Sequence, residues 1–348
     1  IALGLEGLRR QDGIHAAAVV ISPDTITNFL PVQQKGKEAE LVTQFEMHTV
    51  EQLGLLKMDF LGLRNLSVID RTLELIGDEK LDIDNISLDD KKTFELLADG
   101  KMTGVFQLES RVAQSTSRSL KTNTFEDIVA LVALIRPGPL GAGMHNEFTD
   151  RATGRKDIEY LHKDLEEILS ETYGVILYQE QVMQIAQKIS GFELEEADEL
   201  RKAMGKKIPK VMEKQREKFT IGATKNGYSE QFAIELFDQI AYFAGYGFNK
   251  SHSVPYALLA YQTAFLKANY PAEYLSACLT AVKRDKDRTA IFLSEAREMN
   301  VKVNTPDINL SLEDFSVNNG EILFGLSAIR NVGDITAQKI IIERDGSK

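Results

Sequence analysis

Cysteine is almost absent from this sequence, and long apolar runs are missing. The 348 residues contain one cysteine, Cys278. A single thiol cannot form an internal disulfide, which is typical of proteins from a reducing compartment. No apolar stretch approaches the ~20 residues of a membrane helix, and no charged-then-apolar leader opens the sequence. We therefore predict a cytoplasmic protein that makes no membrane contact.

Several signatures of common sites are also missing. The sequence has no internal repeat, no low-complexity tract and no His/Cys spacing of a zinc site. It shows no Ser-His-Asp or Cys-His order, and His15 stands alone, as structural histidines usually do. The stretch Gly205-Lys206-Lys207 lacks the upstream glycine and the following hydroxyl of a phosphate-binding P-loop. These absences exclude the best-known hydrolase, zinc and P-loop classes.

Size and charge define what remains. Apolar residues make up 43% of the sequence and charged residues 27%, which is typical of a soluble globular protein. A chain of 348 residues is long enough for two or three domains. The net charge of −11 argues against a uniformly basic surface for nucleic acid, so the local distribution of charge matters more. Because the sequence begins without methionine, we expect a piece of a longer protein.

Periodicity predicts a small β-rich unit followed by helices. Residues 14–32 and 53–60 are rich in strand-forming residues, and Asn319-Gly320 marks a hairpin turn. Prolines 137 and 271 should each end a helix, and 325–342 should form small helical pieces. The predicted fold class is α+β, predominantly α-helical. Helical periodicity occurs in 67–76, 88–97, 124–135, 179–189, 195–204, 229–241, 257–269 and 288–299.

The apolar stretch 53–63 carries two charged residues, Lys57 and Asp59. Side chains alternate along a strand, so Lys57 and Asp59 share one face with Leu55. One interpretation is a local ion pair at a sheet edge. The other is a metal-binding carboxylate beside a lysine that contacts phosphate, since Mg²⁺ prefers oxygen ligands. The opposite face is predicted to pack in the core and consists of Leu56, Met58 and Phe60.

Two further segments have the composition of anion sites. Residues 201–218 contain eight basic and two acidic residues, and the Gly205 break and Pro209 should let several cations converge. A solvated helix face is the alternative. Residues 244–253 place aromatic, cationic and hydroxyl side chains on a glycine-containing loop before a helix that starts near Pro255. The alternative there is a helix cap formed by Ser253 with packed aromatics.

Seven stretches in order along the sequence resemble motifs of one family, the bacterial replicative DNA polymerase III alpha subunits, or C-family DNA polymerases. The resemblance covers essentially the whole chain, and several of its motifs are long and unusual. The stretches are 13–21, 54–63, 105–110, 130–139, 178–184, 200–207 and 245–253.

The resemblance implies the domain organisation and the catalytic residues. Residues 1–64 would form the end of the thumb and the C-terminal part of the palm, 65–322 the fingers, and 323–348 the truncated start of a helix-hairpin-helix DNA-binding domain. Asp59 would be the third catalytic aspartate and a metal ligand, with Lys57 beside it for the incoming triphosphate. The family's other two aspartates lie upstream, so two Mg²⁺ ions would take further ligands from outside this sequence.

The resemblance also implies substrate contacts in the fingers and in the tail. Arg330 and Gly333 would contact DNA, although Ile335 stands where the family has a second glycine. Lys202 replaces an arginine that the family often has, and lysine lacks the bidentate fork. The implied nucleotide-binding residues are Arg136, Arg201, Lys202, Lys206, Lys207, Tyr246, Asn249, Lys250 and His252.

The function implied is that of a DNA-directed DNA polymerase, a nucleotidyltransferase of DNA replication. It would add deoxynucleotides to a primer 3′ end by two-metal phosphoryl transfer, and this chain alone would be inactive. Its partners would be primer–template DNA, deoxynucleoside triphosphates and, through regions outside this sequence, the sliding clamp and other replisome subunits. Two alternatives are a non-catalytic nucleic-acid-binding module of the same fold and a nucleotidyltransferase or ligase that acts on other substrates.

Overall fold

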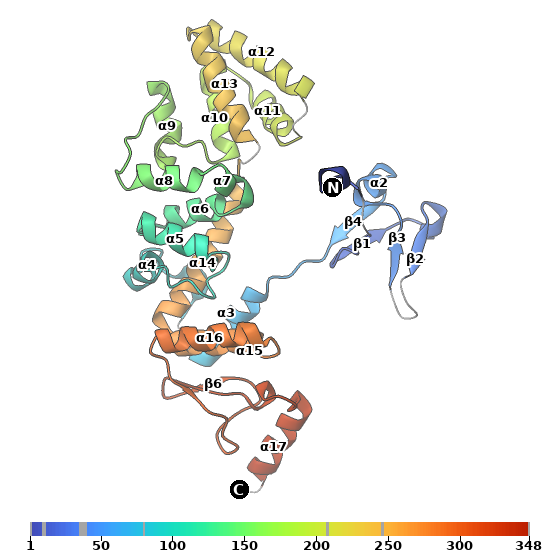
Figure 1. Ribbon diagram of the computed structural model, residues 1–348, viewed down its shortest axis with the longest axis vertical. Helices are drawn as coiled ribbons and strands as arrows, with labels where there is room; N and C mark the ends of the chain where they lie inside the picture. Colours follow the sequence, from blue (N-terminus) through green and yellow to red (C-terminus); the bar gives the residue numbers. More distant parts are fainter. Residues whose placement is uncertain are drawn as a thin grey trace. The chain divides into compact units, whose positions relative to one another are not determined.

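The computed structural model divides the chain into two compact units, which we describe separately. One unit is Ile1–Arg64 and the other is Asn65–Lys348. Among the described residues, no helix has both the length and the apolar character that crossing a membrane requires. The residues described are 2–8, 12–34, 40–78, 81–206, 209–244 and 247–346, and Figure 1 shows their ribbon.

The first unit is built on two short antiparallel strand pairs, β1 with β4 and β2 with β3. In the first pair Ala18 lies opposite Asp59, and Val20 lies opposite Lys57. This pairing confirms the β-rich unit predicted from the two strand-like stretches. The elements are α1 (Ala2–Leu5), β1 (Ala18–Ile21), η1 (Ile26–Asn28), β2 (Val32–Gln34), β3 (Leu41–Thr43), α2 (Met47–Gln52) and β4 (Leu56–Asp59).

The core of the first unit lies on the face of β4 opposite to the one predicted. A small cluster of Leu30, Val50 and Leu55, with Val20 packed against it, covers the face that carries Lys57. The alkyl stem of a lysine can lie along such a cluster while its ammonium group reaches solvent. Alternation correctly separates the two faces, but it does not say which face is covered. The predicted core residues Leu56, Met58 and Phe60 are exposed.

The second unit is almost entirely helical, which confirms the predominantly helical α+β class. Its helices are α3 (Arg64–Ile76), η2 (Ile83–Asn85), α4 (Lys91–Ala98), α5 (Arg111–Leu120), α6 (Phe125–Leu134), α7 (Pro137–Gly141), α8 (Met144–Ala152), η3 (Lys163–Leu165), α9 (Glu166–Leu169), η4 (Ser170–Thr172), α10 (Gln179–Ser190), α11 (Leu194–Lys206), α12 (Pro209–Lys225), α13 (Glu230–Ala244), α14 (Lys250–Asn269), α15 (Pro271–Ala281) and α16 (Lys286–Glu298).

Proline and capping residues set several helix boundaries. Thr124 caps α6 by accepting from the backbone of Asp127, whose carboxylate accepts in return from the Thr124 backbone. The helix ends at Leu134, and Pro137 opens α7 at its first position. In the same way α14 ends just before the Tyr270-Pro271 pair, where α15 begins. Both predicted proline stops are confirmed.

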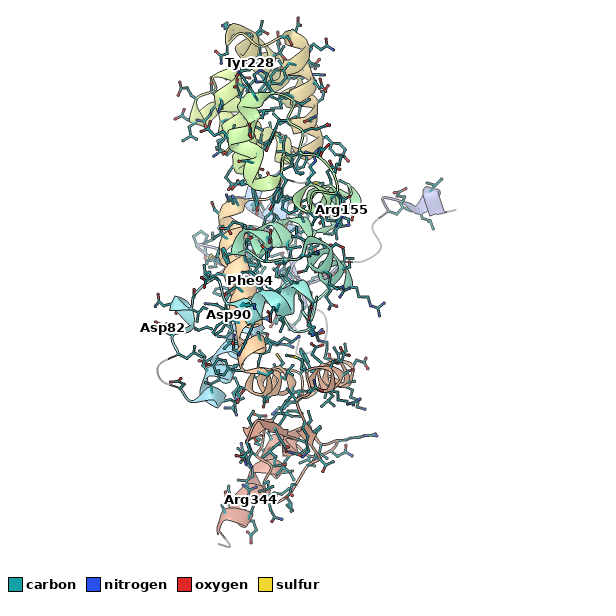
Figure 2. The ribbon with its side chains drawn as sticks, turned by 90° about the vertical axis from the view of Figure 1, so that its left-hand side faces the viewer. Asp82, Asp90, Phe94, Arg155, Tyr228 and Arg344 are labelled. Carbon is teal, nitrogen blue, oxygen red and sulfur yellow. The ribbon has the colours of Figure 1, made fainter. Side chains whose placement is uncertain are left out.

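Helix α14 is held along its length by α6, α4 and α15. Tyr261 of α14 is fully buried, and its hydroxyl accepts from the Asp90 backbone at 2.9 Å and donates to the Ser87 carbonyl at 2.8 Å. Its ring lies 5.7 Å from that of Phe94. Figure 2 labels Asp90 and Phe94 on the α4 side of this contact. These contacts fix the position of α14, and therefore of its N-terminal turn.

The start of α14 differs from the prediction. The helix begins at Lys250, so Pro255 lies inside it and not at its start. Asn249 is the cap, and its side chain accepts from the His252 backbone at 2.8 Å. The predicted cap, Ser253, is buried and donates to the Val129 carbonyl at 2.6 Å. The asparagine four residues before the serine was the better capping signal because it precedes the first turn.

The tail of the second unit is a small sheet followed by a helix. Asn319 and Gly320 both have positive φ, as a tight hairpin turn requires, which confirms the predicted hairpin of β6 and β7. The predicted small helical pieces of 325–342 are also present, as η5 and α17, although α17 extends to Gly346. Its elements are β5 (Val303–Asn304), β6 (Ser316–Asn318), β7 (Glu321–Leu323), η5 (Leu326–Ala328) and α17 (Asp334–Gly346).

Helices α10 and α12 approach each other closely, and this contact predicts the effect of a substitution on stability. A Cβ atom added at Gly222 of α12 would lie 2.2 Å from the Ser190 carbonyl oxygen. We expect Gly222→Ala to lower the free energy of unfolding by ~1–3 kcal/mol, because backbone must move to relieve the overlap. Urea unfolding followed by circular dichroism measures the change.

A glycine in open space provides the control for this substitution. A Cβ atom at Gly141 would meet nothing within 4 Å. Gly141→Ala should therefore leave the unfolding midpoint unchanged or slightly raised. Equal midpoints for the two variants would contradict the packing argument.

Candidate functional site

Asp59 lies at the end of β4 in an ion pair. The Lys57 ammonium donates to its two carboxylate oxygens at 2.7 and 2.8 Å. This hydrogen bond lowers the pKa of Asp59 below its ordinary value, so the carboxylate is ionised at neutral pH. The Asp59 side chain is 40% exposed, and His15 Nδ1 lies 3.9 Å from its Oδ1. The geometry shows the local ion pair that the strand pattern left open, on a carboxylate that solvent can reach.

One carboxylate is a partial metal site. Mg²⁺ takes oxygen ligands in octahedral geometry, usually one or two carboxylates with water and phosphate. Asp59 has the right chemistry for one such ligand. Within the described residues, however, no group of three or more His, Cys, Asp or Glu side chains could hold a metal ion. Asp59 therefore fits Mg²⁺ only together with ligands from elsewhere.

In the second unit a short backbone pairing joins the starts of α10 and α14. Tyr178 and Phe248 form an isolated parallel bridge. The Gln179 backbone donates to the Phe248 carbonyl at 2.9 Å, and the Phe248 backbone donates to the Leu177 carbonyl at 3.1 Å. The Gln179 side chain also donates to the Gly247 carbonyl at 3.0 Å. Two motifs that are distant in the sequence thus form one site.

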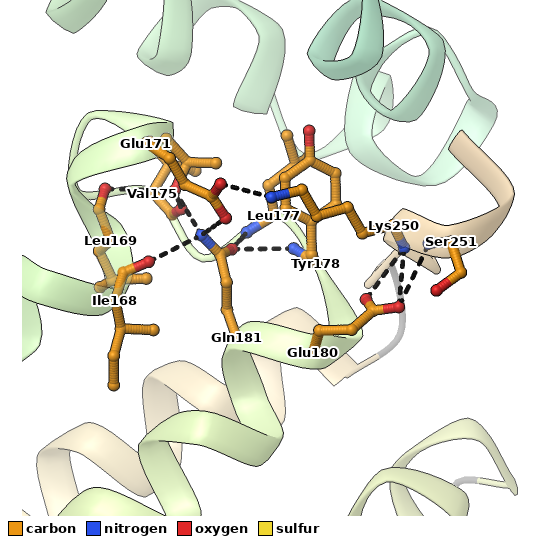
Figure 3. Close-up of polar contacts among 11 residues, drawn as sticks. Ile168, Leu169, Glu171, Val175, Leu177, Tyr178, Glu180, Gln181, Lys250 and Ser251 are labelled. Carbon is orange, nitrogen blue, oxygen red and sulfur yellow. Dashed lines mark hydrogen bonds and ion pairs between the residues drawn. The ribbon is translucent and has the colours of Figure 1, made fainter. Parts of the chain in front are cut away.

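Lys250 lies at this junction between two carboxylates, as Figure 3 shows. Its ammonium group donates to Glu171 Oε2 and lies 5.4 Å from the centre of the Tyr178 ring. Its backbone N–H donates to both oxygens of Glu180, at 3.0 and 2.9 Å. The Ser251 backbone approaches the same carboxylate at 3.4 Å. The first turn of α14 therefore presents amide donors that bind an anionic group.

Arg136 approaches the junction from the start of α7. Its guanidinium carbon lies 4.3 Å from the centre of the Phe248 ring, a distance typical of a cation–π contact. Its Nε is buried without a hydrogen-bond partner. The ring of His252 lies 5.6 Å from Phe248 and 4.1 Å from Tyr256. A cation and three rings thus follow one another beside Lys250.

Arg201 of α11 reaches the same junction. Its Nη1 lies 3.4 Å from Gln179 Oε1, and its Nε donates to Asp198 at 2.8 Å. Lys202 pairs with the other oxygen of Asp198 at 2.7 Å and is 62% exposed. Hydrogen bonds from Lys202 and Arg201 lower the pKa of Asp198. Arg201 therefore joins the site, while Lys202 extends into solvent.

The other cations of residues 201–218 do not all converge as predicted. Arg216 pairs with Asp238 of α13 at 2.8 Å, and Lys218 pairs with Glu196 of α11 at 2.6 Å. Helix α11 includes Gly205 and ends at Lys206, and α12 begins at Pro209, so the break predicted around Gly205 and Pro209 is present one residue after the glycine. Helical spacing distributes residues 210–218 over several faces of α12. Lys207 and Tyr246 lie outside the described residues, as does the side chain of Lys206.

The predicted DNA-contact residues of the tail form a separate group. Arg330 and Gly333 are exposed, and the Gly333 carbonyl accepts from the backbones of Thr336 and Ala337 at the start of α17. Asp334, in the first turn, binds Lys283 at 2.9 Å and Arg284 at 2.7 Å. A carboxylate thus sits beside the amides that phosphate would use.

Sequence reasoning missed Glu171 and Gln181, which lie beside Lys250 at this junction. Gln181 is buried, and its Oε1 accepts from the backbones of Leu177 and Tyr178 at 2.8 and 3.0 Å. Its Nε2 donates to Thr172 at 2.8 Å and approaches Glu171 at 3.5 Å. The motif 178–184 contained Gln181, but Glu171 precedes it and had no sequence signal. A cavity of about 740 Å³ elsewhere, between α8 and α13, is lined by none of the described site residues.

Comparison with known proteins gives family-model matches to three parts of the chain. Family models match as follows: the bacterial DNA polymerase III alpha NTPase domain at residues 1–62, the bacterial DNA polymerase III alpha subunit finger domain at 65–227, and the helix-hairpin-helix motif at 300–348. The matches to the two alpha-subunit models meet near Arg64, where the structure divides into its two units.

Curated relatives agree with these matches. DNA polymerase III subunit alpha of Escherichia coli (strain K12) is 48% identical over 99% of this chain and 31% of its own length. The subunits of Thermus aquaticus and Saccharopolyspora erythraea are 47% and 46% identical, each over 99% of this chain and 29% of its own length. The chain thus spans about a third of the relatives it matches. It belongs to the bacterial DNA polymerase III alpha subunit family.

Proposed function

We propose that this chain is part of a DNA-directed DNA polymerase that adds deoxynucleotides to a primer 3′ end opposite a template. The observation that carries the proposal is the junction of α10 and α14. There Arg136 contacts Phe248, Arg201 contacts Gln179 and Lys250 contacts Glu180, so cations from three separate motifs meet where the starts of α10 and α14 are joined. Cations, amide donors and ring faces are what binding of a nucleoside triphosphate requires.

In this proposal the cations of the second unit hold and orient the triphosphate. Arg201 and Lys250 would neutralise phosphate charge, and Phe248 and His252 would offer ring faces. Holding the nucleotide in one orientation converts the attack of the primer hydroxyl into an effectively unimolecular step. Lys57 remains a proposed contact of the incoming triphosphate, as the family resemblance implies.

Asp59 would be one ligand of a Mg²⁺ site completed by residues outside this chain. Bound Mg²⁺ would neutralise the charge of the phosphate oxygens and stabilise the deprotonated form of the primer hydroxyl that attacks. The exposed, ionised carboxylate of Asp59 suits this role, and the chain alone would be inactive. We also propose that the complete site binds two Mg²⁺ ions. For the domains, we propose that 1–64 form the end of the thumb and the C-terminal part of the palm, 65–322 the fingers, and 323–348 the start of a helix-hairpin-helix domain.

We further propose primer–template DNA and deoxynucleoside triphosphates as ligands, and a cytoplasmic location. Arg330 would contact the DNA backbone from its exposed position before α17. Lys202, Lys206, Lys207, Tyr246 and Asn249 remain proposed nucleotide-site residues. Contacts with a sliding clamp and other replisome subunits would lie outside this chain.

Lys250→Met in the full-length protein tests the nucleotide site. We expect the KM for the incoming nucleotide to rise about tenfold, because a charge-assisted hydrogen bond contributes ~1.5 kcal/mol or more. Steady-state primer extension measures this KM. Lys225→Met, at the exposed end of α12, is the matched control and should leave the KM unchanged.

The same assay separates the polymerase from its alternatives. A polymerase incorporates only the nucleotide that is complementary to the template. Incorporation without a template would indicate a different nucleotidyltransferase, and no incorporation by the full-length protein would indicate a binding module. A KM within twofold of the unsubstituted value in Lys250→Met would remove Lys250 from the site.

A further inference from the structure

Two carboxylates bind the groups that the proposed function assigns to phosphate. Glu171 accepts from the Lys250 ammonium, and Glu180 accepts from the backbone N–H groups of Lys250 and Ser251. Both contacts appear in Figure 3. A phosphate oxygen and a carboxylate oxygen are both anionic acceptors, so they compete for one donor.

We propose that Glu171 and Glu180 compete with the triphosphate for Lys250 and the first turn of α14, and thereby set nucleotide affinity. The inference rests on the proposed function of this site. The incoming triphosphate would displace both carboxylates, and they would return to their donors when pyrophosphate leaves. Glu171 and Glu180 are therefore affinity-setting residues and do not react.

Because the Glu171–Lys250 pair is exposed, separating its two charges costs little free energy. The Lys250 side chain is 37% exposed, and that of Glu171 is 43% exposed. Exposed ion pairs contribute little to stability because water screens both charges. A ligand with several negative charges can therefore replace the carboxylate without a large loss of folding free energy.

The scaffold keeps the competing carboxylates close to their donors. Gln181 is buried, and it ties the Leu177 and Tyr178 backbones to Thr172, the residue after Glu171. Glu180 lies in the first turn of α10, which the Tyr178–Phe248 bridge joins to α14. Both carboxylates thus stay near Lys250 at a high local concentration, which strengthens their competition.

Neutral variants in the full-length polymerase test the proposal. In Glu171→Gln and in Glu180→Gln we expect the KM for the incoming nucleotide to fall about twofold to fivefold. This range corresponds to the free energy of one exposed ion pair, or of one carboxylate at a helix N-terminus. Inorganic tripolyphosphate, which carries no base, should inhibit each variant more strongly by a similar factor. The inhibition constant then isolates the phosphate contacts from base recognition.

Glu167→Gln is the matched control. Glu167 lies in α9, four residues before Glu171. It is 83% exposed and pairs with Lys188. Its neutralisation changes the net charge equally, and it should leave both constants unchanged. A decrease equal to that of Glu171→Gln would show a general charge effect and overturn the proposal.

The outcomes distinguish this inference from the proposed function itself. If Lys250→Met raises the KM while Glu171→Gln and Glu180→Gln leave it unchanged, the nucleotide site stands and the competition fails. A higher KM in the two glutamine variants would show that the carboxylates position Lys250 productively, which also overturns the inference. If Lys250→Met has no effect, the proposed site and the competition fail together.

Discussion

Asp59→Asn in the full-length polymerase should lower the rate of primer extension by at least ~100-fold, or ~2.7 kcal/mol of transition-state stabilisation. Asparagine keeps the size of the side chain and one carbonyl oxygen, but it removes the charge that binds Mg²⁺. The ion pair with Lys57 is also lost. Single-turnover extension of an annealed primer measures the rate.

Folding should be little affected by this change, which makes the loss of rate interpretable. The Asp59 side chain is 40% exposed, and exposed ion pairs contribute little to stability. Glu51→Gln removes another exposed carboxylate of the same unit, from α2, and should leave the rate within twofold. A rate for Asp59→Asn within about tenfold of the unsubstituted protein would refute the metal role.

Glu295→Ala should lower the free energy of unfolding by ~3–5 kcal/mol, the usual effect of removing one partner of a buried ion pair. Lys267 is fully buried. Its ammonium donates to Glu295 at 2.6 Å and to the carbonyls of Lys101 and Thr103 at 2.7 and 2.8 Å. Without Glu295 a buried charge keeps only neutral partners. Urea unfolding of the 348-residue chain measures the loss.

The pH dependence of Glu295→Ala follows from Lys267. Burial lowers the pKa of Lys267 below its ordinary value, and removal of Glu295 should lower it further. Between the folded and unfolded pKa values the unfolded state binds more protons, so stability increases as pH rises through that window. The loss caused by Glu295→Ala should therefore be smaller at pH ~9.5 than at pH ~7.

An exposed pair provides the control for the buried one. Lys91 and Glu95 of α4 are 89% and 64% exposed and lie four residues apart. Glu95→Ala should change the free energy of unfolding by ~0.5 kcal/mol or less. The double variant Lys267→Met/Glu295→Leu, which removes both charges, should recover most of the stability lost in Glu295→Ala. A loss below ~1 kcal/mol in Glu295→Ala would contradict this assignment.

Local signals predicted much of the fold. The pair Asn319-Gly320 specified its hairpin because both residues tolerate positive φ. Pro271 ended α14 because proline excludes helix in the residue before it. Helix α5 was not predicted, since the residues on its buried face are Ala113, Thr116, Ser117 and Leu120, which give only a weak apolar stripe. Nor did alternation in β4 identify the covered face, which depends on Leu30 and Val50 from other elements.

The same difference between local signals and long-range contacts applies to the candidate site. Residue types in the motifs indicated Lys250 and Arg201, because cations next to a helix start suit an anion. The contacts of Lys250 with Glu171 and Glu180 join residues 79 and 70 positions apart. Such pairs depend on how α10 and α14 meet, and no local pattern encodes that meeting. The contacts of these two carboxylates could therefore come only from the structure.

The Tyr178–Phe248 bridge has a mechanical consequence. Arg201 contacts Gln179 at the start of α10, whereas Lys250 belongs to α14. The spacing of these two cations therefore depends on how the two helix starts are joined, through the Tyr178–Phe248 bridge and the hydrogen bonds of Gln179 and Glu180 beside it. A small rotation of one helix about this junction would change the distance between Arg201 and Lys250 while both helices stay folded. The affinity proposed for the triphosphate would then depend on the angle between α10 and α14.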